Sequence, residues 1–117
     1  MKMDFANSAV LLQKAQELKL YEKLVVQLQK DFTLANVAIG LSENITPGNL
    51  KTVLHEKIYF LLLEKFPDYL NLLYIIDVPE KAFKEMPMTD VVEVAEQVTF
   101  LVLKRELQKV WLKAKYS

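Results

Sequence analysis

The scarcity of turn-forming residues is the feature that most constrains how this chain can fold. Only two glycines and four prolines occur in 117 residues. Gly40 and Gly48 bracket one segment, GLSENITPG, and the remaining breaks fall at Pro67, Pro79 and Pro87. Sheet-rich domains need many turns, which draw on clusters of Gly, Pro, Asn and Asp. So few breaks predict an all-α fold made of a few long helices.

The first long segment without glycine or proline, residues 8 to 39, carries helical stripes of apolar residues. The longer stripe has members three or four positions apart: Tyr21, Val25, Leu28, Phe32, Ala35 and Ile39. A shorter stripe precedes it: Leu11, Ala15 and Leu18. Joining the two needs a spacing of three where four is due. We favour one long helix that ends just before Gly40, with a break near Leu18 to Leu20 as the alternative.

The stretch ITPGNL, residues 45 to 50, has the features of a helix start. Thr46 can cap the first turn with its side chain. Pro47 can occupy the first helical position, where a missing N–H leaves no hydrogen bond unmade. The apolar spacing that follows predicts a helix that runs to about Lys65.

The stretch LLYIID, residues 72 to 77, allows two interpretations. A buried strand ending in Asp77 would present a catalytic or magnesium-binding carboxylate, whereas a helix end would not. Pro67 followed by Asp68 signals a helix start, and residues 67 to 77 are long for a strand. A nucleotide site would also need a glycine-rich loop, which two isolated glycines cannot form. We therefore predict a helix, with Asp77 and Glu80 as a capping box for the short helix that follows.

A second Asp-x-x-Glu pair, Asp90 and Glu93, follows Pro87 and predicts the start of the last helix. That helix extends over about 25 residues to near Ala114 and has apolar residues on more than one side. Such a helix either lies at the centre of a bundle or contacts another chain.

The predicted helices agree with a single domain over residues 1 to 117. At 1.5 Å per residue, the first helix would span about 48 Å and the last about 38 Å. The two middle helices, broken at Pro67, would together cover a similar length. We expect an elongated antiparallel bundle of about four helices plus a short helix.

No group of residues has the composition of a catalytic or metal site. His55 is the only histidine and the chain has no cysteine, whereas zinc and di-iron sites recruit several such ligands. Asp90, Glu93 and Glu96 lie near one another at the start of the last helix, where the helix dipole favours acidic residues. No nucleophile, base and orienting group occur in one pattern, which favours a non-enzymatic role without a cofactor or metal.

A basic stripe, Arg105, Lys109 and Lys113, recurs every four residues in the C-terminal helix. Such a stripe can bind phosphate, lipid head groups or an acidic partner. The simpler interpretation is a solvated face at a helix C-terminus, where cations are favoured. Fifteen basic residues balance fifteen acidic ones, which argues against nucleic acid as a partner.

The chain has no sequence signal for a membrane or for export. Its longest apolar run, IYFLLL, residues 58 to 63, is far shorter than the about 20 residues of a membrane span. The N-terminal MKMDFANSAVLL lacks the sustained apolar core of a signal peptide. The absence of cysteine fits a reducing compartment, and we expect a cytoplasmic protein.

Our first functional hypothesis is a helical interaction module that self-associates as a homodimer. The last helix carries more apolar surface than one small bundle can bury. The candidate interface residues are Phe100, Leu103, Leu107 and Trp111. A different protein partner is compatible with the same surface.

The alternative hypothesis is a small-molecule carrier or sensor with an apolar pocket between helices. The residues that would surround this pocket are His55, Tyr59, Tyr69 and Tyr74. Tyrosines at such irregular spacing are more often residues at the edge of a core, whose hydroxyls reach water.

Two stretches, NLLYIIDVPE and LVLKRELQKVW, loosely resemble small helical proteins of bacteria. The resemblance carries no known activity, and it transfers no functional residue to this chain.

Overall fold

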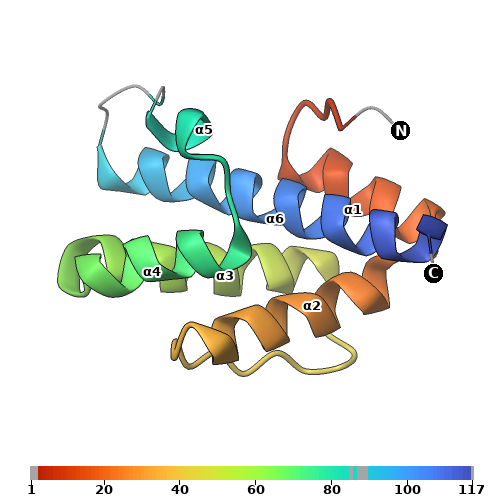
Figure 1. Ribbon diagram of the computed structural model, residues 1–117, viewed down its shortest axis with the longest axis horizontal. Helices are drawn as coiled ribbons and strands as arrows, with labels where there is room; N and C mark the ends of the chain where they lie inside the picture. Colours follow the sequence, from red (N-terminus) through yellow and green to blue (C-terminus); the bar gives the residue numbers. More distant parts are fainter. Residues whose placement is uncertain (1–2, 85, 87–89, 117) are drawn as a thin grey trace.

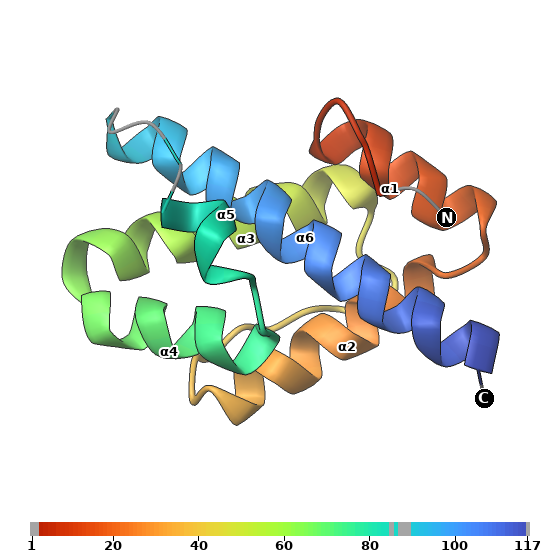
Figure 2. The ribbon, with the colours of Figure 1, turned by 45° about the horizontal axis from the view of Figure 1, so that its top comes forward.

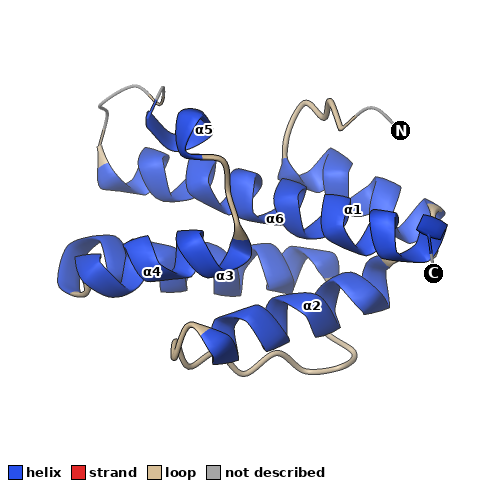
Figure 3. Ribbon diagram, in the orientation of Figure 1, coloured by secondary structure: helices blue, strands red, loops and turns tan. Residues whose placement is uncertain are grey.

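The computed structural model describes residues 3–84, 86 and 90–116. Figure 3 shows that all regular secondary structure within these ranges is helical, which confirms the predicted all-α class. The helices are α1 (Ser8–Glu17), α2 (Tyr21–Leu34), α3 (Pro47–Glu64), α4 (Phe66–Ile76), α5 (Glu80–Lys84) and α6 (Val91–Tyr116) (Figure 1).

Helix α6 lies at the centre of the arrangement and packs against each of the other helices (Figure 2). Its buried residues recur around more than one side: Ala95, Val98, Thr99, Val102, Leu103, Glu106, Leu107 and Val110. Helices α3 and α4 form a hairpin and pack against each other as well as against α6. The many apolar residues of α6 are therefore explained by its central position within this chain.

The molecule is more compact than the sequence suggested. Its principal extents are 36 × 27 × 25 Å. A single first helix would alone have spanned about 48 Å at 1.5 Å per residue. The elongated antiparallel bundle of about four helices is therefore not confirmed, because the long first helix on which it depended is broken.

The break falls between Leu18 and Leu20, so the favoured single helix over residues 8 to 39 is wrong and the alternative is correct. Lys19 adopts a left-handed backbone conformation with φ of 59°. The Leu20 N–H then donates to the Ala15 carbonyl at 2.9 Å, and the Lys19 N–H donates to the Gln16 carbonyl at 3.0 Å. This pair of bonds is the Schellman motif, which ends a helix and satisfies its last carbonyls.

Helix α2 ends in the same way at Leu34, five residues before the predicted end at Ile39. Asn36 has φ of 60°, and the Val37 N–H donates to the Phe32 carbonyl at 2.9 Å. Asparagine tolerates the left-handed region because its short polar side chain relieves part of the penalty. Gly40 does not have a positive φ and does not end a helix.

Helix α3 starts as predicted. The Asn49 N–H donates to the Thr46 hydroxyl at 3.3 Å, and Pro47 is the first helical residue. The helix ends at Glu64, one residue before the predicted Lys65.

Helix α4 contains LLYII, so the helical interpretation of LLYIID is confirmed. Asp77 ends α4 with φ of 69°, and the Val78 N–H donates to the Leu73 carbonyl at 3.0 Å. The Asp77 carboxylate accepts a hydrogen bond from Arg105 Nη2 at 2.9 Å, and it accepts none from the Glu80 N–H. The predicted capping box of Asp77 and Glu80 is therefore wrong.

Helix α6 starts as predicted, because the Glu93 N–H donates to Asp90 Oδ1 at 2.9 Å. Its 26 residues agree with the predicted length of about 25. The predicted break at Pro87 lies outside the described residues.

Candidate functional site

Three charged residues meet in the interior between α2 and α6, and we call them the buried charge cluster: Asp31, Glu106 and Lys109. Asp31 is 4% exposed and Glu106 is 0% exposed. Lys109 Nζ lies 2.5 Å from Asp31 Oδ2 and 2.6 Å from Glu106 Oε1. Nζ also donates to the carbonyl of Ile76, at the end of α4, at 3.1 Å. One ammonium group thus joins α2, α4 and α6.

Helix geometry places these groups. Glu106 follows Leu103 by three positions and precedes Val110 by four, so it lies on the buried stripe of α6. Lys109 is one turn further along α6. On α2, Gln27 lies one turn before Asp31, and its Nε2 donates to Asp31 Oδ1 at 3.1 Å.

The two carboxyl groups ionise differently. Burial raises the pKa of Glu106, the hydrogen bond with Asp31 raises it further, and Lys109 only partly offsets both, so that the pKa is about 8. Burial also acts to raise the pKa of Asp31. The hydrogen bonds from Glu106, Lys109 and Gln27, together with the Lys109 charge, outweigh burial and hold this pKa below its usual value. At neutral pH, Glu106 therefore carries a proton and Asp31 carries a charge that Lys109 balances.

Protonation also explains the contacts of Glu106. If Glu106 were ionised, neither of its buried carboxylate oxygens would have a hydrogen-bond donor among the described residues. The 2.6 Å approach of Lys109 Nζ lacks the directions of a hydrogen bond, although it is close enough for an ion pair. A protonated Glu106 instead donates its O–H to Asp31, which leaves less of its hydrogen-bonding capacity unused.

A carboxylic acid beside a carboxylate is a pair that can move protons. The pair here is covered from one side: Lys113 Nζ donates to Gln27 Oε1 at 2.8 Å, and Gln27 in turn bonds Asp31. A groove of about 580 Å³ between α2 and α6 is lined by Gln27 and Lys113 but not by either carboxyl group. The buried charge cluster therefore serves to hold α2, α4 and α6 together.

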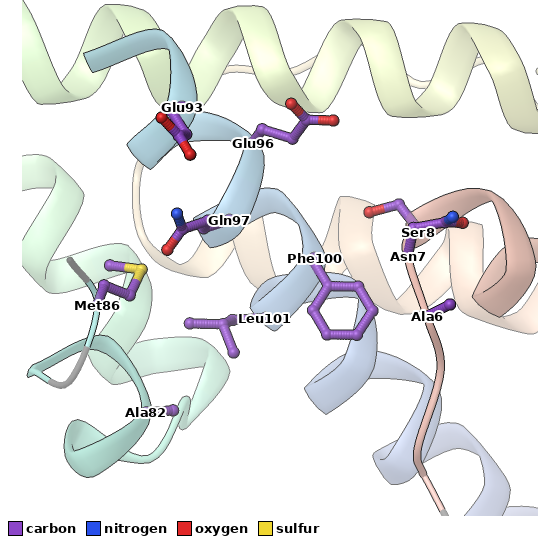
Figure 4. Close-up of a pocket in the computed structure, with 10 residues that line it drawn as sticks. All are labelled: Ala6, Asn7, Ser8, Ala82, Met86, Glu93, Glu96, Gln97, Phe100 and Leu101. Carbon is purple, nitrogen blue, oxygen red and sulfur yellow. The ribbon is translucent and has the colours of Figure 1, made fainter. Parts of the chain in front are cut away.

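A separate cleft of about 480 Å³, the α1–α6 cleft, lies between the start of α1, α5 and the first half of α6 (Figure 4). Its lining residues are Ala6, Asn7, Ser8, Ala82, Met86, Glu93, Glu96, Gln97, Phe100 and Leu101. Its large apolar residues are Phe100, Leu101 and Met86. The two charged residues among them are both acidic, Glu93 and Glu96. An apolar surface with a few polar groups is typical of ligand sites.

A third feature is an apolar stripe on α4, the α4 stripe, made of Phe66, Leu70 and Tyr74. These residues are one turn apart on one face of α4, and they are 50%, 45% and 80% exposed. Asp68 is the one charged residue of α4.

The structure places the four predicted interface residues in different surroundings. Leu103 and Leu107 are completely buried within the chain and cannot form a contact surface in this conformation. Phe100 and Trp111 are half-buried and pack against the core. Phe100 lines the α1–α6 cleft, and Lys115 Nζ lies 4.8 Å above the ring of Trp111.

The four residues predicted to surround a pocket are not brought together around one. His55 donates from Nε2 to the Val92 carbonyl at 3.1 Å, which ties α3 to α6. Tyr59 is half-buried, Tyr69 is buried and Tyr74 is exposed. None of the four lines either cleft described above.

In the basic stripe, Arg105 and Lys109 are half-buried and Lys113 is exposed. Arg105 donates from Nε to the Asp77 carbonyl and from Nη2 to its carboxylate, each at 2.9 Å. Lys109 belongs to the buried charge cluster, and Lys113 bonds Gln27. All three basic groups bind polar partners within the chain, where α6 contacts α2 and the end of α4.

Sequence reasoning missed Asp31 and Glu106. A signal for Glu106 was present, because an acidic residue interrupts the apolar stripe formed by Leu103, Leu107 and Val110. A charged residue at such a position is buried only with a partner. The partner Asp31 comes from a distant helix, and no local pattern identifies it.

Two further findings concern metals and membranes. Within residues 3–84, 86 and 90–116, no three His, Cys, Asp or Glu side chains are grouped so that they can hold a metal ion. Over the same residues, no helix combines the length and apolarity that crossing a membrane requires.

No protein-family model matches the chain, and no significant similarity to a curated protein or to a solved structure is found. The chemistry of the residues themselves is therefore the basis for a function.

Proposed function

We propose that the chain is a helical interaction module that forms a homodimer through the α4 stripe. The observation that carries the proposal is the exposure of Phe66, Leu70 and Tyr74 along one helix face with a single charged residue on the helix. Large apolar side chains exposed together are typical of protein contact surfaces.

The α4 stripe suits a second copy of the same chain. Phe66 and Tyr74 lie one turn on either side of Leu70, so the stripe is symmetric about its centre. In a two-fold pair of antiparallel α4 helices, Leu70 of each copy meets Leu70 of the other, and Phe66 meets Tyr74. The formal net charge of the chain is zero, so two copies have no net repulsion.

The end of α3 adds to this surface. Phe60 and Leu63 are large, exposed hydrophobic residues of α3. Only Lys65 separates α3 from α4, so Leu63 precedes Phe66 by three residues in the sequence. A contact centred on Leu70 has apolar side chains available beyond the α4 stripe.

The test is native mass spectrometry together with sedimentation equilibrium from about 1 to 100 μM, the range in which a contact of moderate affinity is resolved. We expect the wild type to be a dimer at the upper end. We expect Leu70→Glu to be monomeric, because two carboxylates would face each other at the two-fold axis without a counter-charge.

The matched control is Val26→Glu, which places the same charge at an exposed apolar residue of α2 outside the α4 stripe. This variant should remain a dimer, and circular dichroism should show both variants folded. A wild type that is monomeric throughout, or a Leu70→Glu variant that dimerises as well as the wild type, would contradict the proposal.

A further inference from the structure

The buried charge cluster holds the end of α4. This helix ends at Ile76, so the Ile76 carbonyl has no partner within the helix. Ile76 is completely buried, and Lys109 Nζ donates to its carbonyl at 3.1 Å. A buried carbonyl that loses its donor is costly unless it reaches water. The position of the end of α4 therefore depends on where the Lys109 ammonium group lies.

A second contact joins α6 to the same turn. Arg105 donates from Nε to the Asp77 carbonyl and from Nη2 to the Asp77 carboxylate, each at 2.9 Å. Arginine remains charged at every pH at which the chain is folded, so its side chain donates throughout. The contact of Lys109 differs, because its ammonium group also lies against two carboxyl groups, those of Asp31 and Glu106.

Glu106 competes with Ile76 for this ammonium group. Both oxygens of Glu106 are buried without a hydrogen-bond partner among the described residues, and Oε1 lies 2.6 Å from Lys109 Nζ. While Glu106 carries a proton, Asp31 is the anionic acceptor and the third partner is the neutral Ile76 carbonyl. An ionised Glu106 is a second anionic acceptor, and a charge-assisted hydrogen bond to it is stronger than a bond to a carbonyl. Ionisation therefore turns the ammonium group from Ile76 toward Glu106.

The titratable groups that act on Glu106 are Asp31 of α2 and Lys109 of α6 itself. Glu22 and Lys23 of α2 lie further along, in the groove between α2 and α6. Titratable groups on the other helices around α6 are bonded elsewhere or are neutral: Lys14 of α1 with Glu17, Lys51 of α3 with Glu96, His55 of α3 with the Val92 carbonyl, Asp77 after α4 with Arg105, Glu80 of α5 with Lys84, and the buried phenol Tyr69 of α4, whose pKa burial raises.

From these contacts we infer that the buried charge cluster is a pH-operated latch on the end of α4, in which ionisation of Glu106 takes the Lys109 ammonium group away from the Ile76 carbonyl. At neutral pH the latch is closed, and Lys109 joins Ile76 to Asp31. At alkaline pH Glu106 gives its proton to water, Lys109 pairs with both carboxylates, and the last turn of α4 loosens until the Ile76 carbonyl reaches water. The latch acts within one chain and does not rest on the proposed dimer.

The test follows Glu106 and Ile76 together by NMR on the ¹³C,¹⁵N-labelled full chain, from about pH 6 to about pH 9.5. The side-chain ¹³Cδ signal of Glu106 reports its ionisation, and the carbonyl ¹³C signal of Ile76 reports the bond from Lys109. We expect both signals to titrate with one midpoint at about pH 8, the pKa of Glu106. The Asp77 carbonyl, which Arg105 holds, should shift less.

A second measurement detects the loosening itself. Backbone order parameters of residues 76–78 should fall from about 0.85, the value of a rigid backbone, toward the flexible range below about 0.6 as the pH rises through the midpoint. Those of Leu72 and Leu73, which are buried earlier in α4, should remain near the rigid value.

Two variants identify the group responsible. Glu106→Gln is neutral at every pH, so its Ile76 carbonyl signal should not titrate and its latch should remain closed. Glu96→Gln removes an exposed carboxylate from the same helix, and this matched control should titrate like the wild type. Thermal unfolding checks that each variant folds. The paired signals of Glu106 and Ile76 in the wild type decide the question even if Glu106→Gln does not fold.

Three results would overturn the inference. The first is a Glu106 signal that titrates while the Ile76 carbonyl and the order parameters stay constant, because Lys109 would then keep both partners. The second is a Glu106 signal that does not titrate in this pH range. The third is an equal titration of Ile76 in Glu106→Gln. The titrations are repeated in Leu70→Glu, so that the latch and self-association succeed or fail separately.

Discussion

At the scale of single residues, Glu106 links the protonation of the interior to the stability of the fold. While it carries a proton, the buried charge cluster contains one carboxylate and one ammonium group and is balanced. When Glu106 ionises, two buried carboxylates share Lys109, and the excess charge has no water to solvate it. The pKa of about 8 measures how strongly the folded chain resists this change.

We predict that the free energy of unfolding decreases as the pH rises from about 5 to about 8. The pKa of Glu106 is about 8 in the folded chain, against 4.5 as its ordinary value, so the folded state binds more protons in this window. Stability must then fall as protons are withdrawn, in total by about 3 kcal/mol. Urea denaturation followed by circular dichroism at a series of pH values measures the slope.

Glu106→Gln is the control for this prediction, because glutamine is neutral at every pH and keeps an N–H donor for Asp31. Its stability should be nearly constant over the same window. A wild-type slope of zero, or an equal slope in Glu106→Gln, would rule out Glu106 as the cause. Asp31 acts in a different pH range. Because its pKa is lowered in the folded chain, its ionised form stabilises the fold, and this stability is lost only in acid, as the pH falls through the lowered pKa.

At the scale of helices, three helices end at their C-termini in a left-handed residue that is not glycine. Lys19, Asn36 and Asp77 all have positive φ, and each is followed by a buried apolar residue. The residues that follow are Leu20, Val37 and Val78. Each sends its N–H back to the helix that has just ended. The chain thus turns sharply at three points where its sequence carries no glycine, and it accepts the backbone strain of a left-handed residue at each.

Replacing Lys19 by glycine should relieve this strain. Lys19→Gly is expected to be more stable than Lys19→Ala by about 0.5–1 kcal/mol, because both variants lose the same exposed side chain and only glycine lacks the Cβ that disfavours φ of 59°. Urea denaturation of the two variants measures the difference. Alanine as stable as glycine at this position would mean that the Lys19 conformation carries no strain.

The sequence predicts the starts of the helices better than it predicts their ends. Thr46, Pro47 and Asp90 follow strong local preferences, and the helix starts near them were predicted correctly. The end at Lys19 was predicted only as the alternative, and the end at Asn36 was missed. Whether a lysine or an asparagine adopts a left-handed conformation depends on the burial of the residue that follows it. The one local sign was the spacing of three between Leu18 and Tyr21.

At the scale of the whole molecule, the position of α6 decides which apolar residues are available to a partner. Leu103 and Leu107 look equivalent to exposed leucines in the sequence, but α6 is surrounded by its neighbours and buries both. The α4 stripe, in contrast, stays exposed. Periodicity shows that a helix has an apolar face, whereas only the packing of all the helices shows whether that face is covered.

Leu103 and Leu70 should therefore respond oppositely to truncation. Leu103→Ala should lower the free energy of unfolding by about 3 kcal/mol through the cavity it leaves, without changing dimer affinity in the folded chain. Leu70→Ala should weaken the dimer and change the stability of the monomer by less than about 0.5 kcal/mol. Urea denaturation and sedimentation equilibrium of both variants separate the two effects. A Leu103→Ala variant that remains stable but no longer dimerises would indicate that the interface lies on α6 and not on α4.

The central position of α6 also matters for synthesis. Translation proceeds from the N-terminus, so α1 to α5 are complete before the helix that they surround has been made. At about 5–20 residues per second, the 26 residues of α6 take about 1–5 s to translate. During this interval the nascent chain carries amphipathic helices whose common partner is still missing. This is the state that ribosome-associated chaperones bind, and it is the stage at which the growing chain is most open to aggregation.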